Sequence, residues 1–233
     1  MCIRDRRKAD QILVLTSSEF DFKPPQVPAN VHWVGPQLDD PSWTAAWRSP
    51  WPKDDSRPLI LVALSTMFQD QAKTLRTIIA ALATLPVRAL VTTGPVISDN
   101  EVRGSENVIV VSSAPHREVL RETAILLTHC GHGTTLKGLE AGVPLLCMPV
   151  WGDQLDNATR VVDRGAGIRI SHSAAPEKIR AAVRELLAKP SYREAAQRMG
   201  AALARGAGCE DPVALLEALG EKATVRADKI PVS

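Results

Sequence analysis

The 233-residue sequence predicts an α/β fold built on a doubly wound parallel sheet. From Leu59 onward, short apolar runs alternate with segments of helical periodicity, a pattern typical of parallel strands joined by crossover helices. The motifs that stand out all follow an apolar run. The predicted fold therefore gathers them at the carboxyl ends of the strands, where such sheets bind ligands. These motifs occupy residues 65–66, 93–94, 113–116, 128–135 and 151–154.

The order of elements follows from periodicity, prolines and glycines. Two short strands are expected before residue 35, and the proline-rich stretch 36–58 is expected to be a linker that Trp43, Trp47 and Trp51 anchor on an apolar surface. Strands are predicted at 11–16, 31–34, 59–64, 87–92, 107–111, 124–127, 143–150 and 167–170. Helices are predicted at 69–85, 116–122, from about 133 to 142, and at 157–165, 176–188, 192–204 and 213–219.

Composition narrows the class of protein. Hydrophobic residues at 45% and charged residues at 23% are ordinary for a globular protein, and a net charge of +2 gives no argument for nucleic acid. No apolar run approaches the ~20 residues that span a bilayer, and the N-terminus lacks the apolar core of a secretory signal. The four cysteines have neither metal nor disulfide spacing. We therefore expect a cytoplasmic protein with no metal, membrane span or nucleic-acid partner.

The stretch THCGHGTT, residues 128–135, predicts an anion site. It places two glycines between a buried strand and the start of a helix, whose first N–H groups lack intrahelical partners. Glycines let a phosphate approach that backbone closely. The alternative is a glycine-rich turn that serves only the packing of strand on helix.

The same stretch resembles the nucleotide-sugar signature of a known family. HCGHGTT, followed by Glu140, AGVP, Asp153-Gln154 and Asn157, resembles the signature of GT-B glycosyltransferases of the UDP-glycosyltransferase family. The likeness is closest to the actinobacterial branch that acts in antibiotic biosynthesis on macrolides and other polyketides. Residues 62–66 and 113–120 are placed as in the family, so the resemblance covers roughly residues 30 to 220.

The resemblance implies an activity. It implies an inverting hexosyltransferase that moves a hexose or deoxyhexose from a UDP- or TDP-sugar to a hydroxyl of a small hydrophobic acceptor, such as a polyketide or macrolide. The nucleotide sugar is a substrate, and no further cofactor is implied.

The resemblance also assigns contacts to the donor. Ser113 stands where plant members stack a Trp on uracil, and Gly133 stands where they have an Asn, so those two side-chain contacts are missing here. The implied contacts are His129, Gly131, Gly133, Thr134 and Thr66 for the diphosphate, Glu140 for the ribose, Ser113 and His116 for the base, and Asp153 and Gln154 for the sugar.

The domains implied are a remnant of the N-terminal acceptor domain at 1–35, an interdomain linker at 36–58, a C-terminal nucleotide-sugar-binding domain at 59–220 and a frayed tail at 221–233. In the family, a His of the acceptor domain deprotonates the acceptor. None of the histidines here has that context, so we assign no catalytic base and expect this chain to bind donor without transferring sugar. The five histidines are His32, His116, His129, His132 and His172.

Two other functions stay open. A non-catalytic module that binds nucleotide sugars would share every motif. An NAD-dependent oxidoreductase domain would share the fold class, but its G-x-G-x-x-G fingerprint is missing, because Gly131 and Gly133 are followed only by Gly138. Binding of UDP, TDP and NAD distinguishes these functions.

Overall fold

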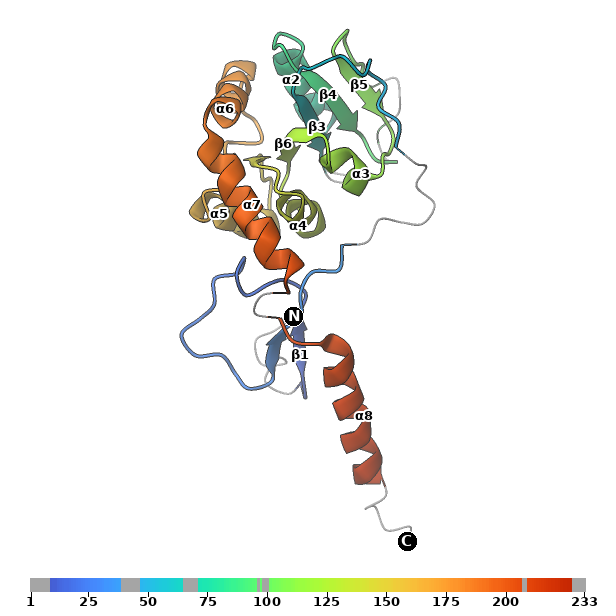
Figure 1. Ribbon diagram of the computed structural model, residues 1–233, viewed down its shortest axis with the longest axis vertical. Helices are drawn as coiled ribbons and strands as arrows, with labels where there is room; N and C mark the ends of the chain where they lie inside the picture. The colour runs from blue at the N-terminus through green and yellow to red at the C-terminus, as the bar shows by residue number, and fades with distance from the viewer. Residues whose placement is uncertain are drawn as a thin grey trace. The chain divides into compact units, whose positions relative to one another are not determined.

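The computed structural model describes residues 9–38, 47–64, 71–95, 97, 101–206 and 209–227, with side chains to Gly220. The chain divides into two compact units, one made of Met1–Gln37 with Ala202–Ser233 and the other of Leu38–Ala201. We call them the small unit and the sheet unit. Element labels follow Figure 1.

The sheet unit contains a fully parallel six-stranded sheet, as predicted (Figure 1). The strand order β5-β4-β3-β6-β7-β8 is that of a doubly wound dinucleotide-binding fold, with its switch point between β3 and β6. Ala63 pairs with Thr128 there, so the two strands end side by side. The strands are β3 (Leu59–Ala63), β4 (Arg88–Thr92), β5 (Val108–Val111), β6 (Thr123–Thr128), β7 (Leu145–Cys147) and β8 (Gly167–Arg169).

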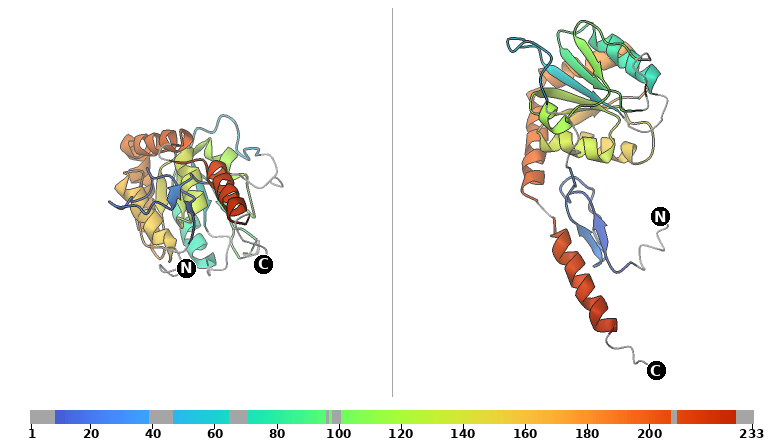
Figure 2. Two further views of the ribbon diagram at one scale, coloured as in Figure 1. Left: turned by 90° about the horizontal axis from the view of Figure 1, so that it is seen from below. Right: turned by 90° about the vertical axis from the view of Figure 1, so that its right-hand side faces the viewer.

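Helices cover both faces of this sheet (Figure 2). On one face α2 packs against α6, and both enclose the same side of β3 and β6, where Ile60, Val62 and Ile125 are fully buried. Side chains alternate along a strand, so the remaining residues of β3 face the other helices. There α4 contacts both α3 and α5. The helices are α2 (Ala72–Leu82), α3 (His116–Leu120), α4 (His132–Glu140), α5 (Asp153–Asp163), α6 (Pro176–Ala188) and α7 (Pro190–Ala204).

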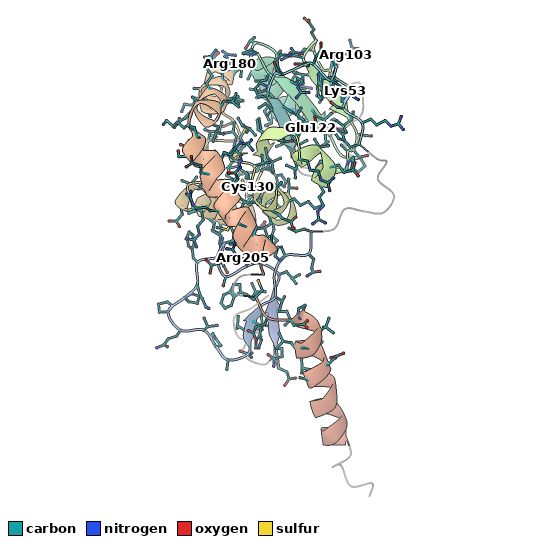
Figure 3. All side chains as sticks on the ribbon, in the orientation of Figure 1. Lys53, Arg103, Glu122, Cys130, Arg180 and Arg205 are labelled. Atoms are coloured by element: carbon teal, nitrogen blue, oxygen red, sulfur yellow. The ribbon has the colours of Figure 1, made fainter. Side chains whose placement is uncertain are left out.

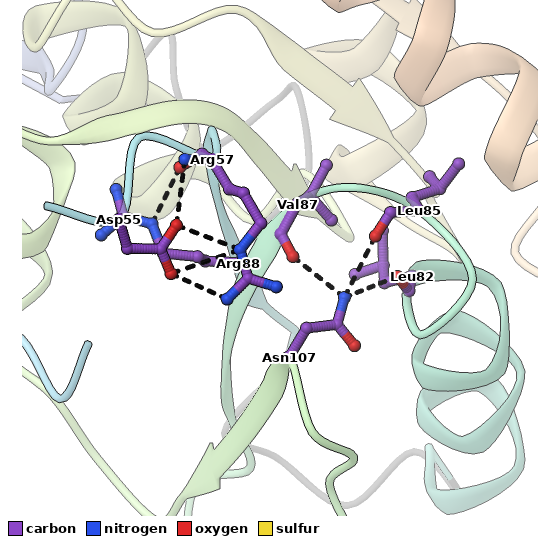
Figure 4. A network of polar contacts seen from close by, with 7 residues as sticks. All are labelled: Asp55, Arg57, Leu82, Leu85, Val87, Arg88 and Asn107. Atoms are coloured by element: carbon purple, nitrogen blue, oxygen red, sulfur yellow. Dashed lines mark hydrogen bonds and ion pairs between the residues drawn. The ribbon is translucent and has the colours of Figure 1, made fainter. Parts of the chain in front are cut away.

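Polar side chains lock the amino ends of the strands, at the edge opposite the motifs (Figure 4). The buried Asn107 amide donates to three carbonyls at the end of α2 and the start of β4, those of Leu82 (3.1 Å), Leu85 (3.3 Å) and Val87 (2.9 Å). Arg88 Nε donates to the carbonyl of Arg57 at 2.8 Å. Because most buried polar groups need partners, these bonds fix the strand entries.

The part of the linker that the structure describes, residues 36–38 and 47–58, forms neither helix nor strand, as expected. Trp51 is buried, and the Arg88 guanidinium lies 5.6 Å from its ring centroid, so Trp51 anchors the linker on the sheet unit. Trp47 donates its backbone N–H to Glu118 at 2.8 Å and its indole N–H to Glu122. Trp43 lies outside the described residues.

The small unit holds a two-stranded parallel sheet of β1 (Ile12–Val14) and β2 (Val31–Trp33), with helix α8 (Pro212–Ala227). His32 Nδ1 lies 2.9 Å from a Glu210 carboxylate oxygen, and the Glu210 N–H donates to the Trp33 carbonyl at 2.7 Å. These contacts tie the residues before α8 to β2.

The predicted elements are confirmed in type and order, with three differences in bounds. Helix α5 begins at Asp153, so the predicted start at residue 157 was wrong. Strand β7 spans Leu145–Cys147, shorter than the predicted 143–150, although the Met148 N–H still donates to the Thr128 carbonyl at 2.8 Å. Helix α8 runs to Ala227, beyond the expected end at Leu219. The assignment of acceptor-domain remnant, linker and donor domain stays a prediction.

Candidate functional site

The turn from β6 to α4 adopts a strained backbone conformation. Cys130 has φ 68°, in the left-handed region that non-glycine residues rarely adopt, at a cost of about 1–3 kcal/mol. Side chains from two elements hold it: the Cys130 N–H donates to Thr128 Oγ1 at 3.2 Å, and the Cys130 carbonyl accepts from Asn157 Nδ2 at 3.0 Å. Figure 3 labels Cys130. Strain maintained in this way is characteristic of functional turns.

Helix α4 begins immediately after this turn without a side-chain cap. Its cap residue is Gly131, and Thr135 N–H donates to the Gly131 carbonyl at 3.0 Å, so the N–H groups of the preceding residues have no intrahelical acceptor. A Cβ placed on Gly133 would meet no described atom within 4 Å. The space beside Gly133 is therefore open among the described residues, and the partial positive charge of a helix start suits a phosphate there.

His129 forms one wall of this opening. Its ring lies against Gly131 so closely that a Cβ there would be 2.6 Å from His129 Nε2, so a side chain larger than hydrogen cannot fit. Among the described residues, the buried Nδ1 has no hydrogen-bond partner. Burial lowers the pKa of His129, and the Ala63 carbonyl and the Asp153 carboxylate oppose that shift. The ring is therefore neutral at pH 7 and donates from one nitrogen.

The start of helix α5 lies next to the β6–α4 turn. Asn157 Nδ2 donates to Asp153 Oδ2 at 3.1 Å as well as to the Cys130 carbonyl. Gln154 Oε1 accepts from the N–H groups of Val150 (2.9 Å) and Trp151 (3.3 Å), so its carbonyl holds the loop together. No role for Asn157 was predicted from the sequence. The spacing of four residues after Asp153, within one helix, was the signal that places the two on one face.

The residues implied for the base lie farther along the same edge. His116 begins α3, and its Nε2 is 3.2 Å from Thr92 Oγ1 at the end of β4. Ser113 is exposed in the loop after β5. Both follow strands β4 and β5, as predicted, on one side of the β6–α4 turn.

Glu140, implied for the ribose, is the last residue of α4 and lies ~12 Å along the helix axis from His132, at 1.5 Å per residue. Its carboxylate is 3.4 Å from Arg117 Nη2 of α3. The structure therefore does not bring Glu140 to the start of α4. Thr66 lies outside the described residues. His129, Gly131, Gly133 and Thr134 lie in the one turn from β6 into α4, and Asn157 links Asp153 to that turn at the Cys130 carbonyl.

A doubly wound sheet with an open helix start at its switch point defines a nucleotide-binding α/β unit. Residues 4–203 match the model of the family described as UDP-glucoronosyl and UDP-glucosyl transferase, and the chain belongs to this family. Its fold is that of GT-B glycosyltransferases.

Known relatives are glycosyltransferases. The chain is 31% identical over 218 residues to 4'-demethylrebeccamycin synthase of Lentzea aerocolonigenes, covering 91% of this chain and 51% of that protein. Its structure is similar to that of the kitacinnamycin glycotransferase (26% identity, TM-score 0.77), covering 89% of this chain and 54% of the other. It shares its fold with the glycosyltransferase VinC in complex with dTDP (24% identity, TM-score 0.68), covering 92% and 52%. The chain thus spans about half the length of the relatives it matches.

None of the described helices is long and apolar enough to span a membrane.

Proposed function

We propose that this chain is the donor-binding half of a cytoplasmic, inverting glycosyltransferase. The enzyme takes a hexose or deoxyhexose from a UDP- or TDP-sugar and transfers it to a hydroxyl of a small hydrophobic acceptor such as a polyketide. The observation that carries this proposal is the space beside Gly133 in the first turn of α4, where a Cβ would meet no described atom within 4 Å. Relatives that act on natural products, among them the rebeccamycin enzyme, support the acceptor class.

The diphosphate of the donor would accept hydrogen bonds from the first N–H groups of α4, from Thr134 and from His129. When the sugar leaves, negative charge grows on the diphosphate. Donors fixed before the reaction stabilise that charge without reorganisation. The Cys130 turn, held by Thr128 and Asn157, supplies this rigidity.

The base and the sugar form the two ends of the donor, and they would lie on opposite sides of the β6–α4 turn along the carboxyl edge of the sheet. The base lies beside Ser113 and His116, after β4 and β5, while the sugar lies after β7, where Asp153 accepts a hydrogen bond from a sugar hydroxyl. Asn157 fixes the orientation of the Asp153 carboxylate. Gln154 contributes through its amide N–H groups, because its carbonyl already accepts two backbone bonds. We assign no base for the acceptor.

Isothermal titration calorimetry of the 233-residue chain with UDP, TDP and NAD tests the proposal. We expect one of the two pyrimidine diphosphates to bind and NAD not to bind. Binding of NAD alone would support an oxidoreductase domain instead. A non-catalytic module is distinguished by assay of the natural full-length protein with the same nucleotide sugar and a polyketide acceptor, since only an enzyme forms the glycoside.

A further inference from the structure

One face of α4 stays accessible along the length of the helix. From Thr135 to Glu140, only Lys137 and Glu140 keep part of their side chains exposed, and the other four residues are buried. At about 100° per residue, Gly133, Lys137 and Glu140 lie within ~60° of one another around the helix axis. Lys137 and Glu140 therefore continue the face on which the space beside Gly133 opens.

This face of α4 is directed toward α3. The two helices are in contact, and Arg117 Nη2 of α3 lies 3.4 Å from each carboxylate oxygen of Glu140. Arg117 follows His116, the first residue of α3, beside which the proposed function places the base. The face that carries Lys137 is thus the one that a nucleoside bound at His116 would meet on its way to the start of α4.

Lys137 and Glu140 differ in their reach toward the start of α4. Residues four apart in a helix have Cβ atoms about 5–6 Å apart, and helical side chains lean toward the N-terminus. The long, flexible side chain of Lys137 therefore extends from one turn further on toward the space beside Gly133. Glu140 begins ~10 Å along the axis from Gly133, and Arg117 holds its carboxylate.

We propose that Lys137 binds the α-phosphate of the nucleotide, the phosphate attached to the ribose, while Glu140 stays paired with Arg117. The proposal rests on the proposed function and adds a binding residue for the nucleotide half of the donor. A nucleoside that runs from His116 toward the start of α4 brings its α-phosphate first to this face. There the Lys137 ammonium donates a charge-assisted hydrogen bond and adds a full charge to the partial charge of the helix start.

The test compares two nucleotides that share the α-phosphate. Affinities for UDP and UMP are measured by calorimetry, or for TDP and TMP if TDP binds more tightly than UDP. Lys137→Met, which removes the charge and keeps a long side chain, should weaken both nucleotides about ten-fold. Lys137→Arg keeps the charge and should stay within about three-fold of the original protein. Lysine, methionine and arginine have similar helix propensities, so both variants should fold.

Two controls address the neighbouring carboxylate and the net charge. Glu140→Gln should leave the affinity for UDP within about two-fold, because the carboxylate does not contact the nucleotide. Lys178→Met removes the same charge from an exposed position of α6 and should also leave UDP binding unchanged.

The salt dependence of binding distinguishes a phosphate contact from a structural role of Lys137. Raising the salt concentration from about 50 to about 300 mM should weaken UDP binding to the original protein more than to Lys137→Met, because added salt screens an exposed charge. A side chain that only supports the end of α4 would leave the two salt dependences equal, and this result would overturn the proposal.

The remaining outcomes separate this proposal from the proposed function. If UDP binds the original protein and Lys137→Met with equal affinity, or if that variant weakens UDP but not UMP, Lys137 does not bind the α-phosphate and the proposed function stands. A ten-fold loss of UDP affinity in Glu140→Gln would return the nucleotide contact to Glu140. If neither UDP nor TDP binds the original protein, the proposed function itself fails.

Discussion

Gly133 lies in the first turn of α4 with no described atom within 4 Å of the position of a Cβ. Nothing in the packing requires glycine there, and its φ is not positive. A glycine in a helix costs about 0.5–1 kcal/mol relative to alanine. The proposed function accounts for this glycine, because the space beside it would admit the diphosphate.

Gly133→Ala should separate stability from binding. The methyl group should raise the free energy of unfolding by about 0.5–1 kcal/mol and weaken UDP binding by about 1–2 kcal/mol, because it occupies the space next to the α4 N–H groups. Denaturant unfolding and calorimetry measure the two effects. Gly220→Ala in α8, also with no described atom near its Cβ, is the control. It should stabilise similarly and leave binding unchanged. Unaltered UDP affinity in Gly133→Ala would place the diphosphate elsewhere.

His129 should contribute a neutral hydrogen bond to the diphosphate. Burial lowers the pKa of His129, so the ring is uncharged at pH 7 in the free protein. His129→Ala should cost about 1.5–3 kcal/mol of UDP affinity, because even a neutral ring N–H donates to a charged diphosphate oxygen. Calorimetry at pH 7.5 measures the loss. An affinity equal to that of the original protein would exclude His129 from the site.

His129 should also make the stability of the folded protein depend on pH. Its folded pKa is below the ordinary value of 6.5, so between these two values the unfolded chain binds a proton that the folded chain does not. Stability should therefore fall as pH drops through 6.5 toward the folded pKa. Urea unfolding of His129→Ala between pH 5 and 8 should show a shallower fall than the original protein. Parallel curves would contradict the burial of a neutral ring.

At the scale of elements, Asn157 connects α5 to the β6–α4 turn through Cys130 and binds Asp153 within α5. Asn157→Asp retains the size but replaces both donors with a charge that repels Asp153. We expect a loss of about 1–3 kcal/mol of stability and weaker UDP binding, because the Cys130 carbonyl loses its partner and the strained turn relaxes.

Thr159→Ala, on the exposed side of α5, is the control for Asn157→Asp and should leave UDP affinity unchanged. A folded Asn157→Asp variant with full UDP affinity would show that the turn keeps its shape without this bond.

Asn107 joins α2, β4 and β5 at the amino edge through three carbonyls. Asn107→Ala should lower the free energy of unfolding by about 1–3 kcal/mol, because all three carbonyls lose a donor, although those of Leu82 and Leu85 still accept from the N–H groups of Leu85 and Val87. UDP affinity should not change, since the amide lies at the edge opposite the site. Ser105→Ala removes only the bond to the Asn107 carbonyl oxygen and should cost less.

The elements also show what sequence alone determines. Apolar runs and their spacing were sufficient for the sheet, its parallel order and the start of α4, because burial and period fix those features. The start of α5 was missed because Gly152, with φ 63°, turns the chain directly into the helix at Asp153, and a run of polar residues looks like a loop.

The pairing of Glu140 with Arg117 was missed for a different reason. It depends on how α3 packs on α4, and no local pattern encodes a contact between residues 23 positions apart. The same holds for the bond from Asn157 to Cys130, which spans 27 positions.

At the scale of the molecule, an ion pair fixes the end of the linker, next to the Arg57 carbonyl that accepts from Arg88 of β4. Arg57 donates to both carboxylate oxygens of Asp55, and this hydrogen bonding lowers the pKa of Asp55 from 3.8 to about 2. The Asp55 carboxylate therefore binds a proton less readily in the folded than in the unfolded state. Its contribution to stability is complete above pH 4 and disappears as pH falls from about 4 to 2.

Urea unfolding between pH 2 and 5 measures this contribution. Asp55→Asn should flatten the part of the pH profile between 2 and 4. Asp54→Asn, at the exposed neighbouring position, should leave that part unchanged. Identical profiles for Asp55→Asn and the original protein would mean that Arg57 pairs equally well in the unfolded chain.

The polar lock of Asn107, Arg88 and Arg57 and the open groups around Gly133 lie at opposite ends of the same strands, ~16 Å apart for a five-residue strand. Substitutions that far apart, with no shared partners, have nearly additive effects on free energy. In directed evolution, a library aimed at new donor sugars could therefore start from a parent already stabilised at the amino edge. Destabilising changes near Asp153 or Gln154 would then be tolerated for longer, and more substitutions around the sugar could be explored.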